Sequence, residues 1–324
     1  MSFSLEVKKE LCKQKIEGAT VQSLLCGMIL SSGSLVLGSS GVTFTVSSEN
    51  ADYIEYFKSV LNKFYPTAEY KETVENVNFK QKERIELKID SVSGRQILTE
   101  LGIISFSKDS SFIINRLGEN TLTLEDDGKV NYLKGMFLGC GSISIPEPID
   151  VNDFSKKKKN SGYHMEWNVQ SKEQAEHIID LLAGFDILCR NVQRNDSYVV
   201  YLKEAESISM LLGILGANKS VLTLENERAG REMRNLVNRQ ANCISANIDK
   251  SINTALKQLE AIEIIRQTIG IEGLPESLQE VALARLANPE GSLSEIMEVL
   301  ETKISKGAVS QRFKKIEQIA KEIG

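Results

Sequence analysis

The sequence predicts an α+β protein in which a duplicated α-β-β-α-β-β-α unit is followed by an all-α helix-turn-helix domain. Three observations lead to this prediction. An internal repeat occurs at an offset of 108 residues, a stretch without strand pattern follows it, and three short helices end the chain. We expect two repeats over about 1–110 and 111–220, a helical linker over 221–269 and the helix-turn-helix domain over 270–324.

The repeat is clearest in two apolar segments. Residues 25–37 read LCGMILSSGSLVL and residues 133–145 read LKGMFLGCGSISI, with Leu, Gly, Met, Leu, Gly and Ser in common. A second pair of segments also agrees, SSENADYI at 47–54 and SKEQAEHI at 171–178. Chance rarely produces two such matches in the same order, so we infer two copies of one folding unit.

The same order of elements is predicted in each copy. In the first copy, we expect helices near 20–31, 49–64 and 93–101, and strands near 34–37, 42–47, 68–75 and 82–90. In the second copy, we expect helices near 129–139, 171–183 and 205–215, and strands near 142–146, 163–170, 187–193 and 197–203. Each copy therefore predicts one four-stranded sheet.

The remainder of the chain is predicted to be helical. Residues 225–267 form one long helix or two, and Gly270 and Gly273 interrupt the helical pattern. Three short helices follow. The first starts at Pro275 and ends near 287, the second starts at a Ser292–Glu295 capping box and ends near 301, and the third spans 306–323.

Small residues in the repeated segments predict a close helix contact. Gly27 and Ser31 are four residues apart, as are Gly135 and Gly139. Residues at this spacing share a helix face, and small side chains let two helices approach closely. We expect the two helices to pack on each other along these positions. A buried helix with incidental glycines is the alternative.

The segments LCGMILSSG and LKGMFLGCG resemble the LAGLIDADG motif of homing endonucleases. The resemblance implies two helices packed at a pseudo-twofold axis above a DNA-binding saddle of strands. In those enzymes the acidic residue before the final glycine binds the divalent metal that drives phosphodiester cleavage. Ser32 and Cys140 occupy these positions. A hydroxyl and a thiol are poor ligands for Mg²⁺, so we expect the fold without catalytic residues or a metal.

The last two helices have the pattern of a helix-turn-helix, with apolar residues at helical spacing. The N-terminus of a helix offers free amides to phosphate, and Gln, Lys and Ser side chains reach base edges. From Lys303 onward the net charge is +4. A structural bundle with a solvated basic face is the alternative. The predicted DNA-binding residues are Ser305, Lys306, Gly307, Ser310, Gln311, Arg312, Lys314 and Lys315.

Two further basic segments have open interpretations. One is a loop that either makes a secondary, salt-sensitive DNA contact or is flexible and solvated; it contains Lys156, Lys157, Lys158 and Lys159. The other is an Asn-rich helical segment that is a docking linker, a partner site, a DNA contact or a solvated connector; it contains Arg228, Arg231, Arg234 and Arg239.

The whole chain resembles the WhiA family. The resemblance rests on the degenerate LAGLIDADG duplication, the Asn/Arg-rich run over 234–249, the terminal segment ISKGAV at 304–309 and the opening MSFSLEVKKEL. It implies a bacterial transcription regulator linked to sporulation, cell division and chromosome segregation, without nuclease activity. It also implies double-stranded DNA as partner, with RNA polymerase or another regulator as a further candidate. The alternatives are a division-associated interaction protein whose DNA binding is incidental and a metal-dependent endonuclease.

Composition is compatible with this interpretation. The 324 residues carry a net charge of −5, so a DNA contact must be a small local patch. Five scattered cysteines without a CxxC pattern and two histidines argue against a disulfide framework and a zinc site. We expect a cytoplasmic, nucleoid-associated protein with no signal peptide, no membrane span, no cofactor and no evident small-molecule substrate.

Overall fold

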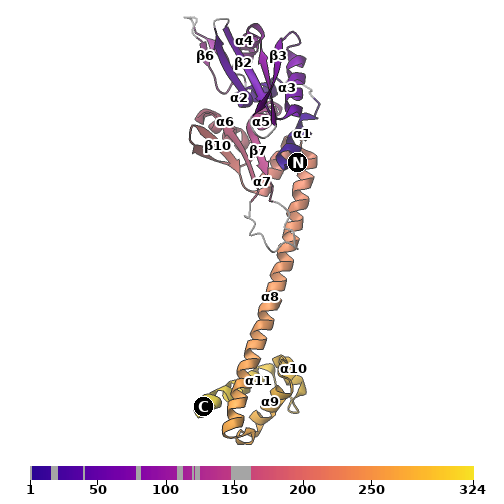
Figure 1. Cartoon of the computed structure of the whole chain (residues 1–324), viewed down its shortest axis with the longest axis vertical. Coiled ribbons are helices and arrows are strands. Elements are labelled where there is room, and N and C mark those ends of the chain that lie inside the picture. The colour runs from indigo at the N-terminus through magenta and orange to yellow at the C-terminus, as the bar shows by residue number, and fades with distance from the viewer. Residues whose placement is uncertain are drawn as a thin grey trace. The chain divides into compact units, whose positions relative to one another are not determined.

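The chain forms two compact units, Met1–Gly230 and Arg231–Gly324 (Figure 1). The computed structural model describes residues 2–15, 21–38, 41–77, 82–107, 112–118, 120, 125–146 and 162–324. Within this part of the chain, no helix is long and apolar enough to cross a membrane.

The first copy of the repeat folds as predicted. Its strands pair antiparallel in the order β1-β2-β4-β3. Buried side chains alternate along β2 and β4, as expected for a sheet with one face on a core. The elements are α2 (Val21–Ser32), β1 (Gly33–Gly38), β2 (Gly41–Ser48), α3 (Ala51–Phe64), β3 (Tyr70–Val77), β4 (Lys82–Ile89) and α4 (Ser91–Glu100).

The second copy has the same topology, with strand order β7-β8-β10-β9. The identical order in both sheets confirms that the repeat in sequence is a repeat in structure. Its elements are α5 (Asp126–Cys140), β7 (Gly141–Ser144), β8 (His164–Val169), α6 (Lys172–Ala183), β9 (Arg190–Arg194), β10 (Ser197–Leu202) and α7 (Ala205–Ile214).

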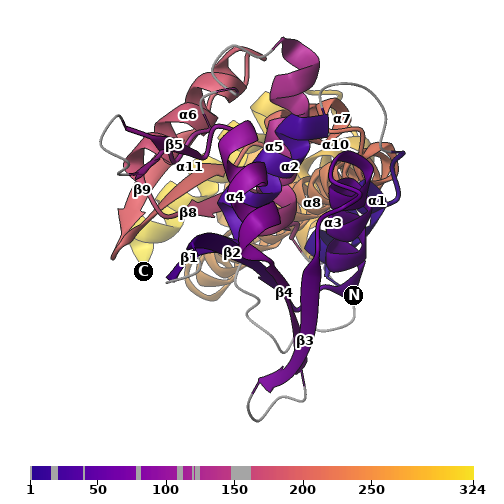
Figure 2. The ribbon, with the colours of Figure 1, turned by 90° about the horizontal axis from the view of Figure 1, so that it is seen from above.

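The two copies share one hydrophobic core. Helices α2 and α5 lie side by side at its centre (Figure 2), and they contact each other along most of their length. The single tryptophan, Trp167, is fully buried in this core and packs edge-on against Phe137. Its fluorescence therefore reports on the folding of residues 1–230.

Two elements were not predicted from the sequence. One is α1 (Phe3–Cys12), whose Val7 and Leu11 are buried. The other is a small sheet of two strands, β5 (Ile104–Phe106) and β6 (Phe112–Ile114). The strands β5 and β6 have only three residues each, too few to show alternation. Helix α1 is held by contacts with residues distant in sequence.

Helix α1 anchors the start of α8 (Asn218–Thr268). The Glu10 carboxylate accepts hydrogen bonds from the backbone amides of Lys219 at 2.7 Å and Ser220 at 2.9 Å, and from the Ser220 hydroxyl at 2.6 Å. The first amides of a helix have no partner within the helix, and the positive end of the helix dipole attracts a carboxylate. Glu10 thus caps a helix that begins more than 200 residues later in the chain.

Glu10→Ala is expected to lower the free energy of unfolding of residues 1–230 by about 1–3 kcal/mol, because two amides at the start of α8 lose a charged acceptor. Urea unfolding followed by Trp167 fluorescence measures this change. The control is Glu6→Ala, because Glu6 lies on the same helix and is exposed. Equal unfolding midpoints for the two variants would show that the capping contact contributes nothing.

The second unit is entirely helical. A single helix, α8, covers the region for which the sequence left one helix or two open. A 3-10 turn at Ile271–Gly273 follows Gly270, whose φ of 74° favours glycine. Three helices complete the unit: α9 (Glu276–Ala287), α10 (Leu293–Val299) and α11 (Lys306–Ile323). The Ser292–Glu295 capping box and the Ser305 N-cap are both present, as predicted.

Candidate nucleic-acid interface

Helix α11 has one apolar face that is held in the core of the second unit. Val309, Phe313, Ile316 and Ala320 are buried there against α8, α9 and α10. These residues recur at intervals of three and four, so they occupy one side of the helix. The opposite side is therefore turned away from the core.

The predicted DNA-binding residues divide into two groups by exposure. The exposed group contains Ser305, Lys306, Gly307, Gln311, Lys314 and Lys315. At 100° per residue, Gly307, Gln311 and Lys315 lie on the side of α11 opposite Phe313, and Lys314 lies about 100° from it. Ser310 and Arg312 are half-buried and flank the apolar face. Gln318, which was not among the predicted residues, extends the outward face by one turn.

Arg312 is directed toward α9 and not outward. Its guanidinium lies 3.5 Å from the Glu280 carboxylate, and both side chains are half-buried. Glu280 also accepts a hydrogen bond from the Thr302 amide at 2.9 Å, in the turn between α10 and α11. This hydrogen bond, with Arg312 nearby, lowers the pKa of Glu280. Glu280 and Arg312 thus fix the turn and the start of α11 against α9.

A buried arginine organises the second unit and was not singled out from the sequence. Arg285 is 1% exposed. It donates hydrogen bonds to the Gln258 side chain at 3.0 Å and to the carbonyls of Asn288 and Gly291. Its guanidinium also lies 5.3 Å from the ring centre of Phe313. Arg285 therefore connects α8, the turn before α10 and the core face of α11.

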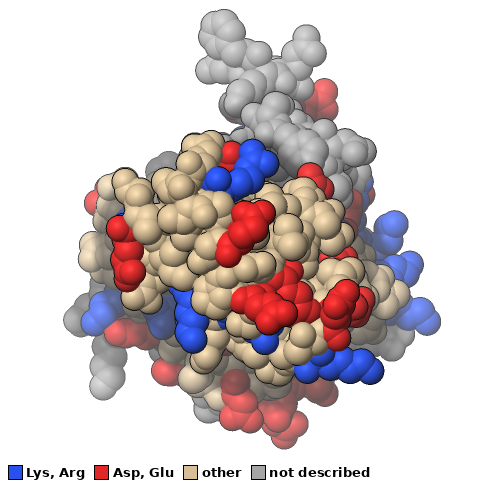
Figure 3. All heavy atoms as spheres, turned by 90° about the horizontal axis from the view of Figure 1, so that it is seen from below, with Lys and Arg blue, Asp and Glu red and all other residues tan. Residues whose placement is uncertain are grey.

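Charge is distributed unevenly within the second unit. Helices α9 and α10 and their connecting turns are mainly acidic, whereas α11 is mainly basic. In the view of Figure 3, acidic and basic side chains are interspersed, and no patch of a single sign covers that face. Among the three short helices that end the chain, α11 therefore carries the excess of basic side chains.

The small residues of the repeat lie where α2 and α5 are closest. A Cβ atom on Gly27 would overlap the Tyr132 carbonyl oxygen, and one on Gly135 would lie 2.8 Å from the Met28 amide nitrogen. Ser31 donates a hydrogen bond to the Gly135 carbonyl at 3.3 Å, and Gly139 faces Ser31. The four positions therefore set the distance between the two helices.

The two positions that match the metal-binding acids are electrically neutral. The Ser32 hydroxyl lies 2.6 Å from the Tyr53 hydroxyl and donates to the Met28 carbonyl at 2.8 Å. The Cys140 thiol lies 3.3 Å from the Met136 carbonyl, and burial raises its pKa to about 12. No cluster of His, Cys, Asp and Glu suited to a metal ion occurs among the described residues.

Two basic segments were also predicted as possible contact sites. The lysine loop at 156–159 lies outside the described residues. In the Arg-rich segment, Arg228 is near Glu225 at 3.7 Å, and Arg239 is exposed on α8. The roles of both segments stay predictions.

Two family models together match most of the chain. The WhiA LAGLIDADG-like domain matches residues 21–104 and 129–234, and the WhiA C-terminal HTH domain matches residues 237–320. The chain belongs to the WhiA family. Both halves of the structure thus correspond to known WhiA domains, and the LAGLIDADG-like half is degenerate at Ser32 and Cys140.

Individual WhiA relatives span the whole chain. A protein of Clostridium perfringens (strain 13 / Type A) is 34% identical over 326 residues, and one of Clostridium tetani is 33% identical over 325; each alignment covers 100% of this chain and 98% of the relative. Both are named "Probable cell division protein WhiA". The crystal structure of full-length DUF199/WhiA from Thermatoga maritima has a TM-score of 0.58 at 24% identity, covers 100% of this chain and 99% of that chain, and shows the same fold.

Proposed function

We propose that this protein is a sequence-specific DNA-binding transcription regulator linked to cell division, chromosome segregation and sporulation. The observation that carries the proposal is α11, a capped helix with a packed apolar face and an exposed face of Lys, Gln and Gly. The HTH family match supports DNA as the partner, and the relatives' name supports the link to division. Residues 270–324 would read DNA, 1–220 would act as a scaffold or partner platform, and 221–269 would join them.

The exposed residues of α11 divide into two roles in this proposal. Ser305, Lys306 and Gly307 lie at the helix N-terminus, where free amides and a lysine suit a phosphate group. Gln311 and Lys314 project from the middle of the outward face, where side chains of a recognition helix reach base edges. Lys315 lies beside them and suits a second phosphate. Arg312 acts by positioning the helix through Glu280.

The proposal is tested by mapping binding sites with chromatin immunoprecipitation and sequencing, followed by gel shifts of the full-length chain on the sites found. We expect specific binding that weakens steeply with salt and is unchanged by EDTA. Combining Gln311→Ala with Lys314→Ala should abolish site preference. If the double variant binds the same sites with wild-type affinity, α11 is not the reader and the protein is better described as an interaction protein whose DNA binding is incidental.

Gln311→Ala and Lys315→Ala are expected to have different effects on DNA binding. Gln311→Ala should reduce the discrimination between the best site and a single-base variant by about 1–3 kcal/mol, because an amide side chain reads base edges. Lys315→Ala should weaken binding to all sequences similarly. It should also reduce the slope of log K against log salt concentration by about one, the contribution of one phosphate contact. Fluorescence anisotropy with paired duplexes at several salt concentrations separates the two patterns. A uniform loss for Gln311→Ala would contradict base reading at that position.

We further propose that the protein has no nuclease activity. The neutral Ser32 hydroxyl and the protonated Cys140 thiol support this part of the proposal, since hard divalent metals prefer carboxylate oxygens. The test is nicking of supercoiled plasmid with Mg²⁺ or Mn²⁺. Cleavage by the wild type that disappears in a Ser32→Ala and Cys140→Ala double variant would establish an endonuclease instead.

The proposed setting is the bacterial cytoplasm at the nucleoid, where the DNA partner is found. RNA polymerase or another regulator is the proposed protein partner, and the lysine loop at 156–159 is a proposed secondary DNA contact. Crosslinking of the DNA-bound chain followed by mass spectrometry would identify such a partner. A partner that is crosslinked equally well after the DNA has been digested contacts the protein directly. A partner that is lost with the DNA was bound only to the same DNA.

A further inference from the structure

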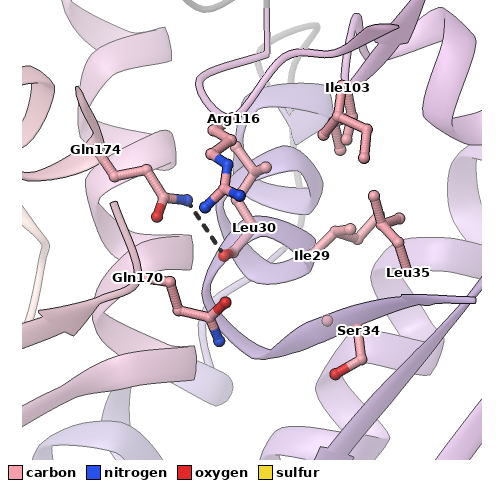
Figure 4. Close-up of a pocket in the computed structure, with 10 residues that line it drawn as sticks. Ile29, Leu30, Ser34, Leu35, Ile103, Arg116, Gln170 and Gln174 are labelled. Atoms are coloured by element: carbon pink, nitrogen blue, oxygen red, sulfur yellow. Dashed lines mark hydrogen bonds between the residues drawn. The ribbon is translucent and has the colours of Figure 1, made fainter. Parts of the chain in front are cut away.

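A cavity of about 360 Å³ opens in the first unit between α2, β1 and the start of α6 (Figure 4). One wall is apolar and includes Ile29, Leu35 and Ile103. The other end is polar and includes Arg116, Gln170 and Gln174. A cavity of this size with an apolar wall and a few converging polar groups is typical of a site for a small molecule.

The duplication explains why space is left at this place. Ile29, Ser34 and Leu35 correspond, at the repeat offset of 108, to Phe137, Ser142 and Ile143. In the second copy α1 covers the corresponding groove. There the Ser4 hydroxyl accepts a hydrogen bond from the Ile143 amide at 3.3 Å, and the Lys8 ammonium lies 5.8 Å from the centre of the Phe137 ring.

In the first copy, no helix equivalent to α1 covers the groove within the described part of the chain. The small β5–β6 sheet and the residues next to it cover it instead, with Ile103, Ile114 and Arg116 on its wall. They fill the groove only in part, and the cavity is the space that remains. The cavity therefore results from the way in which the two repeats pack against each other.

The polar end of the cavity contains a hydrogen-bond donor, the Gln174 amide, that makes only a long hydrogen bond within the chain. Gln174 is 5% exposed, and its amide donates to the Leu30 carbonyl at 3.5 Å, which is the long limit for a hydrogen bond. Figure 4 shows Arg116 and Gln174 directed toward each other beside that carbonyl, with Gln170 below them. Arg116 is an exposed residue. Glu173 lies near Arg116, but its carboxylate is held at the start of its own helix with Ser171.

We propose that this cavity binds a small organic monocarboxylate. The carboxylate would lie between Arg116 and Gln174, and the hydrocarbon part would lie against Ile29, Leu35 and Ile103. A guanidinium binds a carboxylate through two parallel hydrogen bonds, and a buried amide adds a third donor. No acidic side chain lines the cavity among the described residues, which disfavours a cationic ligand. The proposal is independent of DNA binding by α11.

The test uses the full-length chain and isothermal titration calorimetry with butyrate, isovalerate, hexanoate and octanoate, each compared with its primary amide. We expect saturable binding of at least one acid and at least about tenfold weaker binding of its amide, because the charged hydrogen bonds are lost. Arg116→Gln should weaken binding of that acid by about tenfold or more, and Gln174→Leu should weaken it several-fold. Ser34→Trp, at the open side of the cavity, should block binding.

The matched control is Arg190→Gln, which removes an exposed arginine of the same unit from strand β9, away from the cavity. It should bind the acids as the wild type does. Trp167 fluorescence shows whether each variant is folded before binding is measured. The proposal is overturned if none of the four acids binds saturably, if acid and amide bind equally, or if folded Arg116→Gln retains wild-type affinity.

Discussion

Gly135→Ala is expected to lower the free energy of unfolding of residues 1–230 by about 3 kcal/mol or more. The new methyl group would overlap the Leu24 carbonyl oxygen and lie 2.8 Å from the Met28 amide nitrogen. Both atoms belong to the backbone of α2, so no side-chain rotation relieves the overlap and the two helices must move apart. Because α2 and α5 form the centre of the shared core, the displacement reaches both repeats.

The measurement is urea unfolding followed by Trp167 fluorescence, since this residue is buried beside α5. The control is Gly213→Ala in helix α7, where no atom lies within contact distance of the added methyl group. That variant should be unchanged or stabilised by up to about 1 kcal/mol, because alanine is the better helix former. A Gly135→Ala protein with the stability of Gly213→Ala would show that α2 and α5 are not in close contact.

Arg285→Ala is expected to destabilise residues 231–324 by about 3–5 kcal/mol. Removing the guanidinium leaves the buried Gln258 side chain and the Asn288 and Gly291 carbonyls without their donor. It also removes the cation that packs against the Phe313 ring. Burial lowers the pKa of Arg285, but a guanidinium stays protonated at any ordinary pH, so the loss should not depend on pH near neutrality.

The second unit contains neither tryptophan nor tyrosine, so its unfolding is followed by circular dichroism at the helical minimum. Trp167 fluorescence in the same sample should be unchanged, because it reports only on the first unit. Arg266→Ala is the control, since Arg266 is exposed and pairs only with the neighbouring Glu263; it should cost less than about 1 kcal/mol. Loss of Trp167 burial in Arg285→Ala would mean that the two units unfold together, contrary to this expectation.

The start and the helical phase of α11 were predictable from sequence, whereas the direction of its flanking side chains was not. The Ser305 N-cap and the apolar spacing of Val309, Phe313 and Ile316 are local signals, and they set the start and the phase of α11. Which polar residues face outward depends on what covers the flanks of the helix. Arg312 was grouped with the DNA-binding residues, yet its guanidinium meets Glu280 of α9, a partner 32 residues away that no local pattern indicates.

Some features of the structure could not be predicted from any local pattern in the sequence. Helix α1 mixes apolar and charged residues, and its stability comes from contacts with residues such as Ile143 and Ser220, far along the chain. Arg285 has the sequence environment of an ordinary surface arginine, and only its surroundings in the folded unit show that it is buried. The cavity beside Gln174 depends on how α2, β1, α6 and the β5–β6 region meet, which no single segment encodes.

The amino-acid sequence was enough to predict the duplication, the order of the helices and strands within each repeat, two helix caps of the second unit and the membership of the WhiA family. These follow from periodicity, capping residues and repeated motifs, which act over a few turns of chain. Four features could be seen only in the folded protein: the Ser32–Tyr53 hydrogen bond, the desolvation of the Cys140 thiol, the pairing of Arg312 with Glu280 and the space beside Arg116. These depend on desolvation and on contacts between residues distant in sequence, which arise when the elements pack together.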